Sequence, residues 1–310
     1  MKILFAGSDE IAVPVLTYLA SHNLVGAVLT TPDAPGRRGK SLLPTPVKAR
    51  ALELGLPVLQ PEHLKKEARE DAAAQCCDTL LSFCYGKIFG PRFLSLFKRK
   101  FNIHPSMLPC YRGCAPLQAA ILNQDDTCAI SIQDIAPALD EGDIYITQSF
   151  RLDGTETITS LSEKVASLAP SLVEDLLMNI DVFKPRRQSE DGVSYTTFVK
   201  KDDARLDFTR SARALHSAVR AYEKWPKAYC LLDGQPLYLL GVYGSVFDIP
   251  DEQCAEAPGT VVSHEKGKGF RIATGNGYLY VSELQLPTKK AMDSAAFLNG
   301  RHDMISKVLT

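Results

Sequence analysis

Asn102 and His104 lie two positions apart in the segment 101–109. An imidazole can transfer protons, and an amide can donate a hydrogen bond to a developing oxyanion. Apolar residues alternate with these two side chains, which predicts a short strand whose residues i and i+2 share one face. Pro105 follows and stops further pairing. Ligands of parallel α/β sheets bind at the carboxyl ends of the strands, so both side chains are expected at a ligand crevice. On these residues alone, a polar pair satisfied within the core stays open as an alternative.

Asp140 could complete this set, in the segment Ala-Leu-Asp-Glu-Gly-Asp at 138–143. A carboxylate two positions before Gly142, shortly before an apolar run, can be presented from a tight turn. An amide donor, an imidazole base and a carboxylate that orients the imidazole suit acyl transfer to an amine. The sequence does not establish that Asp140 reaches His104, because the two are far apart along the chain.

The elements that must position these residues follow an alternating pattern. Apolar runs at 2–6, 25–30, 57–59, 79–84 and 101–103 predict strands, and the segments 11–20, 46–54, 64–74, 91–96 and 115–122 predict helices. This alternation indicates βαβ units in a Rossmann-like, mostly parallel sheet with helices on both faces. The runs 128–133 and 143–150 are expected as antiparallel additions, and a long amphipathic helix at 161–178 closes the domain.

A second domain is expected after a polar, turn-rich stretch. The length of 310 residues fits about two domains, and we expect a catalytic domain at 1–183, a linker at 184–205 and a smaller domain at 206–310. In the last part, short apolar runs are separated by Asp233-Gly234 and Gly275-Asn276-Gly277. Such runs predict a small barrel or sandwich, of which we expect an OB-like β-barrel.

Composition excludes several classes of protein. The chain is 45% hydrophobic and 23% charged with a net charge of −1, which excludes global disorder and gives no strong bias toward polyanions. None of the eight cysteines forms a CxxC pair, so no metal site is expected. No apolar run reaches a membrane span of about 18 residues, and the first residues look like a strand rather than a signal peptide. We therefore expect a cytoplasmic protein with no membrane partner.

The stretch 31–46 is a long Pro- and Gly-rich loop that carries Arg37, Arg38 and Lys40. It nearly matches a phosphate-binding P-loop, but Ala34 stands at the first glycine position and prolines follow where the motif needs a helix. Long loops in compact domains are uncommon and often functional. A loop that contacts a polyanion and a merely solvated basic loop are both compatible with these residues.

Taken together, the motifs resemble one known family. Asn-x-His-x-Ser-x-Leu-Pro at 102–109, Tyr-Arg-Gly at 111–113 and Leu-Asp-Glu-Gly-Asp at 139–143 are similar to the folate-dependent formyltransferases. Supporting segments extend the resemblance over nearly the whole chain. It implies transfer of the formyl group of 10-formyltetrahydrofolate to the α-amino group of initiator methionyl-tRNA, by a monomer that needs no metal.

The resemblance also implies roles for individual residues. Asn102, His104 and Asp140 would be catalytic. The folate donor would be bound by Tyr85, Gly86, Ser106, Met107, Leu108 and Pro109. The tRNA would be contacted by Arg37, Arg38 and Lys40 and by the C-terminal domain at 206–310. Two alternatives are a sugar-nucleotide N-formyltransferase that uses the same donor and a non-catalytic RNA-binding protein; the basic loop argues against the first, and the complete catalytic set argues against the second.

Overall fold

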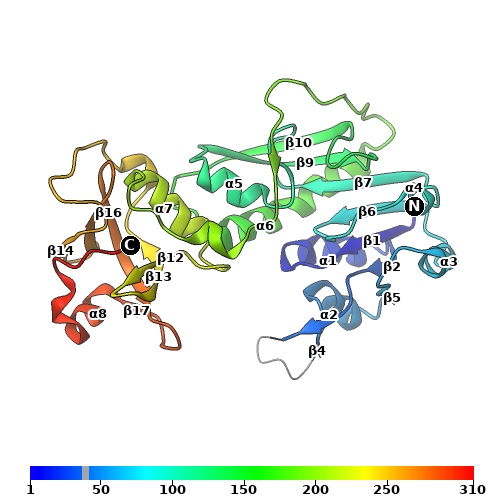
Figure 1. Cartoon of the computed structure of the whole chain (residues 1–310). Coiled ribbons are helices and arrows are strands. Elements are labelled where there is room, and N and C mark those ends of the chain that lie inside the picture. The colour runs from blue at the N-terminus through cyan, green and yellow to red at the C-terminus, as the bar shows by residue number, and fades with distance from the viewer. Residues whose placement is uncertain (37–41) are drawn as a thin grey trace. The chain divides into compact units, whose positions relative to one another are not determined.

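The structure is a computed structural model that describes residues 1–36 and 42–310. The chain divides into two compact units (Figure 1). The first unit consists of Met1–Gly113, Ala129–Ser149 and Ser162–Tyr195, and the second consists of Cys114–Cys128, Phe150–Leu161 and Thr196–Thr310. The boundaries expected from composition, with a linker at 184–205, stay a prediction.

A seven-stranded sheet is the centre of the first unit. Its strands are β1 (Ile3–Gly7), β2 (Val25–Leu29), β5 (Val58–Leu59), β6 (Thr79–Phe83), β7 (Arg99–His104), β9 (Thr127–Asp134) and β10 (Ile144–Arg151), in the order β10-β9-β7-β6-β1-β2-β5. The pairs β1–β2, β1–β6, β2–β5 and β6–β7 are parallel, whereas β9 runs antiparallel to β7. The predicted mostly parallel sheet is confirmed, and the candidates Asn102 and His104 lie on its interior strand β7.

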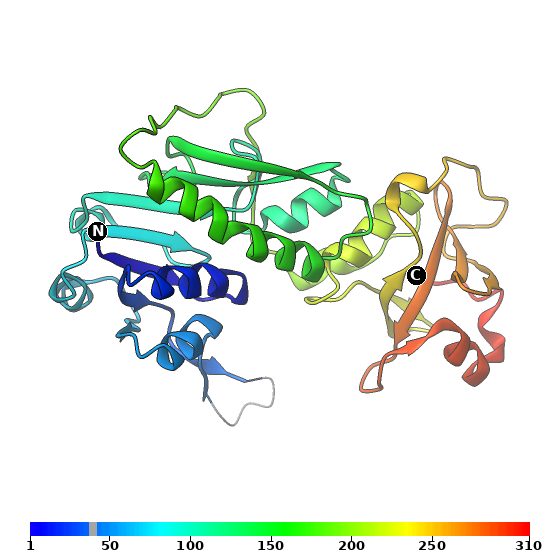
Figure 2. The same cartoon turned by 180° about the vertical axis from the view of Figure 1, so that it is seen from behind.

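In the described part of the chain, the α-helices that accompany this sheet are α1 (Val13–Ser21), α2 (Pro46–Glu53), α3 (Lys66–Ala74), α4 (Pro91–Leu94) and α6 (Ile158–Met178). Local sequence fixes where they begin. Pro46 opens α2 after Thr45, whose hydroxyl caps the helix by accepting from the Lys48 amide. Figure 2 shows α1 and α6 in front of the strands, on one face of the sheet.

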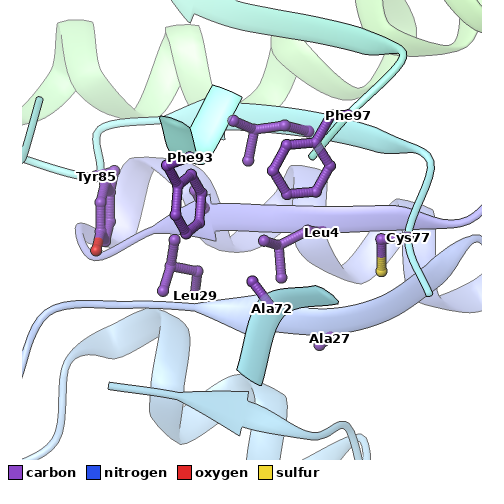
Figure 3. Packing of buried hydrophobic residues seen from close by; sticks show 10 residues of the cluster. Leu4, Ala27, Leu29, Ala72, Cys77, Tyr85, Phe93 and Phe97 are labelled. Carbon is purple, nitrogen blue, oxygen red and sulfur yellow. The ribbon is translucent and has the colours of Figure 1, made fainter. Parts of the chain in front are cut away.

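The opposite face is covered by α3 and α4. Side chains that share this face of the strands form a cluster with the aromatic residues after β6 (Figure 3). The cluster consists of Leu4, Ala6, Ala27, Leu29, Ala72, Cys77, Leu80, Tyr85, Phe93 and Phe97. Helices thus cover both faces of the sheet, as predicted, and the strands carry apolar side chains on both sides.

The basic stretch 31–46 differs from the loop that the sequence predicts. β3 (Ala34–Pro35) and β4 (Leu42–Leu43) pair antiparallel, so the stretch carries a two-stranded ribbon. At its base, the Lys48 ammonium lies 2.7 Å from the Asp33 carboxylate. The residues Arg37, Arg38 and Lys40 lie outside the part of the chain that the structure describes.

The second unit is built around an antiparallel sheet with the strand order β12-β13-β16-β15-β14, to whose strand β16 the short β17 is added. The strands are β12 (Tyr229–Leu232), β13 (Gln235–Val242), β14 (Val261–Glu265), β15 (Gly269–Ala273), β16 (Tyr278–Gln285) and β17 (Met292–Asp293). Asp233 and Gly234, with φ of 51° and 75°, make the tight β12–β13 turn. This half-barrel confirms the predicted fold class.

Three helices belong to the second unit: α5 (Pro116–Leu122), α7 (Ala212–Ala221) and α8 (Ser294–Gly300). Helix α5 packs on α7, so a segment from the α/β part of the sequence is covered by the C-terminal part. Asp293 caps α8, a helix that the periodicity does not predict. Within residues 1–36 and 42–310, no helix combines the length and the apolar character that a membrane crossing requires.

Candidate active site

Strand β7 delivers Asn102 and His104 to the carboxyl edge of the parallel sheet. It pairs with β6 on one side, where Asn102 is opposite Ser82, and with β9 on the other, where His104 is opposite Ser131. The side chain of His104 is only 5% exposed. A polar ring so deeply buried at a strand end needs polar partners, and these identify the site.

The Asp140 carboxylate gathers the candidates. Its Oδ1 accepts hydrogen bonds from Asn102 Nδ2 at 3.1 Å and from Gln133 Nε2 at 2.9 Å. Its Oδ2 accepts from the Gly113 amide at 2.9 Å and lies 3.6 Å from His104 Nδ1. The structure therefore brings together the three residues that the sequence proposes as one catalytic set, although Asp140 is distant from the other two along the chain.

The turn that presents Asp140 has a demanding backbone. Asp140 itself has a φ of 54°, in the left-handed region that Asp tolerates better than most residues. Two positions later, a Cβ on Gly142 would collide with the Asp134 carbonyl, so only glycine fits there. The Asp-x-Gly spacing noted in the sequence is thus what allows the carboxylate to point back to β7.

His104 is held from its other ring nitrogen by the backbone of the segment that follows. Its Nε2 lies 2.8 Å from the carbonyl oxygen of Tyr111, a residue with a φ of 60°. A carbonyl only accepts, so Nε2 carries a hydrogen and donates it. The ring is therefore fixed between the Tyr111 carbonyl and the Asp140 carboxylate.

The short strand β8 (Arg112–Gly113) supplies further contacts to this site. Its partner is β11 (Tyr195–Thr196), and the Arg112 amide donates to the Ser194 carbonyl at 2.9 Å. Because Gly113 donates its amide to Asp140, the strand places one fixed donor against the carboxylate. The motif Tyr-Arg-Gly thus contributes backbone groups, a role that side-chain types alone do not reveal.

A layer of buried amides lies behind the carboxylate, and the sequence reasoning missed it. Gln133 of β9 and Gln188 are 1% and 7% exposed. Gln188 Nε2 donates to Gln133 Oε1 at 3.0 Å, and Arg112 donates to Gln188 Oε1 from both Nε and Nη2. Only the position of Gln133, one residue before the end of a strand, could have indicated this layer. Gln188 lies in a polar stretch expected to be a linker.

The Cys84 thiol interacts electrostatically with the Asp140 carboxylate. The protein atoms packed around its sulfur, then the negative charges of Asp9 and Asp140, raise the pKa of this thiol to about 12, although the residue as a whole is exposed. The thiol stays protonated near neutral pH, and a protonated thiol is a poor nucleophile. Covalent catalysis through Cys84 is not what this site provides.

The segment expected to bind folate follows β7 directly. Ser106 is buried and donates from Oγ to the Cys110 carbonyl at 2.6 Å, and Ser131 Oγ donates to the Ser106 carbonyl at 2.8 Å. Leu108 is also buried, Met107 is 43% exposed, and the bond to Pro109 is cis. The segment is thus anchored beside His104 by its alternate residues.

Tyr85 and Gly86, the other residues expected at the folate, lie at the end of β6. The Tyr85 ring is buried in the core cluster, stacked on Phe89 with centroids 5.2 Å apart, and burial raises the pKa of its hydroxyl to about 12. Its carbonyl accepts from Ser8 Oγ at 3.1 Å. Gly86 is exposed with a φ of 83°. Their backbone, rather than the Tyr85 ring, is what a ligand could reach.

The described residues contain no cluster of three or more His, Cys, Asp or Glu side chains that could hold a metal ion. The polar groups gathered at the end of β7 are instead an amide, an imidazole and a carboxylate, each within hydrogen-bonding or near-contact distance of the next. This donor set can orient an imidazole and place an amide hydrogen at an oxyanion.

Comparison with known proteins assigns the chain to a family. The sequence profile described as "Formyl transferase" matches residues 1–177, and the profile "Formyl transferase, C-terminal domain" matches residues 199–302. The chain belongs to the formyl transferase family. The family resemblance expected from the motifs around β7 is confirmed.

Full-length relatives carry a more specific name. A protein of Thermotoga neapolitana named methionyl-tRNA formyltransferase is 36% identical over 307 residues, which cover 97% of this chain and 96% of the relative. A protein of the same name from Borreliella burgdorferi, strain ZS7, is 34% identical over 314 residues, covering 100% of this chain and 99% of the relative. The similarity thus extends through both units.

Solved structures share the fold at low sequence identity. HypX from Aquifex aeolicus in complex with tetrahydrofolic acid has a TM-score of 0.65 at 17% identity, covering 98% of this chain and 48% of that chain. The sugar 3N-formyl transferase WlaRD has a TM-score of 0.64 at 18% identity, covering 94% and 99%. Methionyl-tRNA formyltransferase from Clostridium thermocellum has a TM-score of 0.58 at 14% identity, covering 79% and 94%.

Proposed function

We propose that this chain transfers the formyl group of 10-formyltetrahydrofolate to the α-amino group of initiator methionyl-tRNA, and that it works as a cytoplasmic monomer. The observation that carries the proposal is the Asp140 carboxylate, whose two oxygens are 3.1 Å from Asn102 Nδ2 and 3.6 Å from His104 Nδ1. An amide, an imidazole and a carboxylate joined at a strand end form a site for acyl transfer to an amine.

The reaction is balanced without any oxidant or metal. The neutral amine attacks the formyl carbon, a carbon–nitrogen bond forms and negative charge develops on the formyl oxygen. When the intermediate collapses, the bond from the formyl carbon to N10 of the folate breaks. The attacking nitrogen loses one proton and N10 gains one, so the site must move a single proton between two nitrogens.

Each catalytic residue has a defined task in this scheme. One hydrogen of the Asn102 amide is used by Asp140, which leaves the other for the oxyanion. Loss of such a donor costs roughly 3 kcal/mol of transition-state stabilisation. His104 shuttles the proton, while Asp140 orients the ring. Because Nε2 donates to Tyr111 in the structure, transfer from this nitrogen requires exchange of that bond for one to substrate or water.

Two observations favour methionyl-tRNA over a sugar nucleotide as acceptor. The relatives named methionyl-tRNA formyltransferase are 34–36% identical over at least 97% of this chain, whereas the sugar formyl transferase shares its fold at 18% identity. The basic stretch with Arg37, Arg38 and Lys40 offers charges for tRNA phosphates. A non-catalytic RNA-binding protein would have no use for the buried set around Asp140.

The proposal is tested by formyl transfer from 10-formyltetrahydrofolate, with methionyl-tRNA, uncharged tRNA and amino-sugar nucleotides offered separately. We expect formylation of methionyl-tRNA alone. Formylation of a sugar nucleotide with no reaction on methionyl-tRNA would replace the acceptor. Binding of tRNA without formylation of any acceptor would support the non-catalytic alternative.

A further inference from the structure

Gln188 is a buried polar side chain next to the site, and neither the proposed chemistry nor the motifs give it a task. It is buried, at 7% exposure, in the stretch that the sequence predicts as a linker. The two hydrogens of its Nε2 are shared among three acceptors, the carbonyls of Asp140 and Gly142, both at 2.8 Å, and Gln133 Oε1 at 3.0 Å. A glutamine of a solvated linker would be exposed, whereas both polar atoms of this side chain are buried and hydrogen-bonded.

Its carbonyl oxygen is anchored on the other side by a charge. Arg112 donates to Gln188 Oε1 from Nε at 3.1 Å and from Nη2 at 2.9 Å. The remaining guanidinium nitrogen donates to Tyr195 Oη at 2.8 Å and lies 3.2 Å from Glu141 Oε1. The bifurcated, charge-assisted contact fixes which end of the Gln188 amide is oxygen and therefore where its hydrogens point.

The orientation of the Gln188 amide determines how Gln133 faces the Asp140 carboxylate. Because Gln188 donates to Gln133 Oε1, the amide nitrogen of Gln133 must face the other way, toward Asp140 Oδ1 at 2.9 Å. If Gln133 were flipped, its oxygen would face the carboxylate and repel it. Gln188 also ties down the carbonyls on either side of Glu141, in the turn where Asp140 adopts a φ of 54°.

We propose that Gln188 is a positioning residue for formyl transfer, acting on Asp140 in two ways. It sets the direction of the Gln133 amide that donates to the carboxylate, and it pins the strained turn that carries it. The inference rests on the proposed function. It goes beyond that function by assigning a role in turnover to a side chain in the stretch 184–205, which the sequence predicts as a linker.

Two substitutions separate these contacts from side-chain volume. Gln188→Met keeps a similar shape and removes both the donor and the acceptor. Gln188→Glu keeps an acceptor for Arg112 but faces the two carbonyls and the Gln133 oxygen with negative charge, which favours the flipped Gln133. The matched control is Gln75→Met, because Gln75 donates from its side chain to Asp71 O at the end of α3, away from the site.

We expect Gln188→Met to lower kcat for methionyl-tRNA about 10- to 100-fold, because displacement of a catalytic group by about 1 Å can cost up to about 100-fold. Gln188→Glu should lower it further. The KM for the folate and for methionyl-tRNA should stay within about twofold of wild type, and Gln75→Met should leave kcat unchanged. A residue that only stabilises the fold would instead lower Tm without this separation of kcat from KM.

The decisive comparison repeats Gln188→Met in an Asp140→Asn background, with the rate of a single turnover as readout. We expect the effect of Gln188→Met to shrink to less than about threefold, because the charge it positions is gone. An equal factor in both backgrounds would overturn the inference, as would a wild-type kcat in both Gln188 variants. If neither variant folds, Gln188 serves stability and the inference is also wrong. A wild-type chain that does not formylate methionyl-tRNA would instead remove the proposed function.

Discussion

The two buried histidines at polar positions, His104 at the end of β7 and His216 in α7, are nearly equally hidden, at 4% and 1% exposure. Their charged partners have opposite sign. His104 faces acceptors, with the Tyr111 carbonyl at 2.8 Å and the Asp140 carboxylate at 3.6 Å. His216 faces a donor, because Arg220 Nε donates to its Nδ1 at 3.0 Å.

The difference separates a histidine placed between a carbonyl and a carboxylate from one that accepts a hydrogen bond from an arginine. Burial and then the positive charge of Arg220 lower the pKa of His216 to about 4, so this ring is neutral at ordinary pH. It helps to orient Arg220, which is itself buried and donates to the Glu156 carbonyl at 2.7 Å. Burial alone therefore says little about function, and the groups that surround the ring decide it.

The largest predicted effect is a loss of kcat in variants of the residues around His104. Asp140→Asn should lower kcat about 10²- to 10⁴-fold, because the charge opposite the ring is lost while the shape is kept. Asn102→Ala should cost about 10²-fold through the missing oxyanion donor. Steady-state formylation of methionyl-tRNA measures both, and circular dichroism checks the fold. A kcat within threefold of wild type for Asp140→Asn would show that the carboxylate has no part in turnover.

A second prediction concerns the stability that His216 contributes. Its pKa is lowered from the usual value of about 6.5 to about 4 on folding, so between these values the unfolded chain binds a proton that the folded chain does not. Stability therefore falls as the pH drops through this window, by about 2 kcal/mol between pH 7 and pH 5 for this group.

His216→Asn removes the titrating ring and retains an acceptor for Arg220. Urea titrations at pH 7 and pH 5 should show that the loss of unfolding free energy on acidification is smaller in the variant by about that amount. Turnover at pH 7 should change little, in contrast to the variants around Asp140. An identical acid loss in both proteins would mean that His216 is protonated in the folded state.

The basic stretch should influence binding rather than turnover. Arg38→Ala is expected to raise the KM for methionyl-tRNA about tenfold and to reduce the steepness of its salt dependence by about one counterion, since one phosphate contact is lost. Arg37→Ala and Lys40→Ala should have smaller effects in the same direction. The KM for the folate serves as the internal control. Unchanged tRNA binding at all salt concentrations in Arg38→Ala would leave this stretch without a role in recognition.

The smallest effect is predicted for Cys84→Ser. Burial and the charges of Asp9 and Asp140 raise the pKa of this thiol to about 12. The thiol is therefore protonated near neutral pH, and the reaction should not depend on it. We expect kcat to stay within about twofold of wild type between pH 7 and pH 8.5. A fall of tenfold or more would indicate that the sulfur takes part directly.

Local patterns were sufficient to predict most of the fold. The alternation of apolar runs and helical segments predicted the parallel sheet, and Asp233-Gly234 marked a hairpin turn because a left-handed pair suits it. The spacing of Asn102 and His104 placed both at the end of β7. These features depend on residues that are close in sequence, where backbone preference and side-chain period are decisive.

Long-range contacts could not be predicted in the same way. The hydrogen bonds of Gln188 to Gln133 and Arg112 join residues from three segments, and a polar, turn-rich stretch looks the same whether it is solvated or buried. Likewise, the change of composition at 183–205 gives no indication that α5 packs on α7 in the second unit. A cut at the expected linker would remove from α5 the helix that it packs on.

The central claim is that Asn102, His104 and Asp140 act as one unit in formyl transfer. It is tested most directly by the single-turnover rate of methionyl-tRNA formylation in wild type, His104→Ala, Asp140→Asn and the double variant. If Asp140 acts through the ring, the double variant should be no more than about threefold slower than the slower single variant. If the two losses multiply instead, or if His104→Ala reacts within threefold of wild type, Asp140 and His104 do not form one catalytic unit.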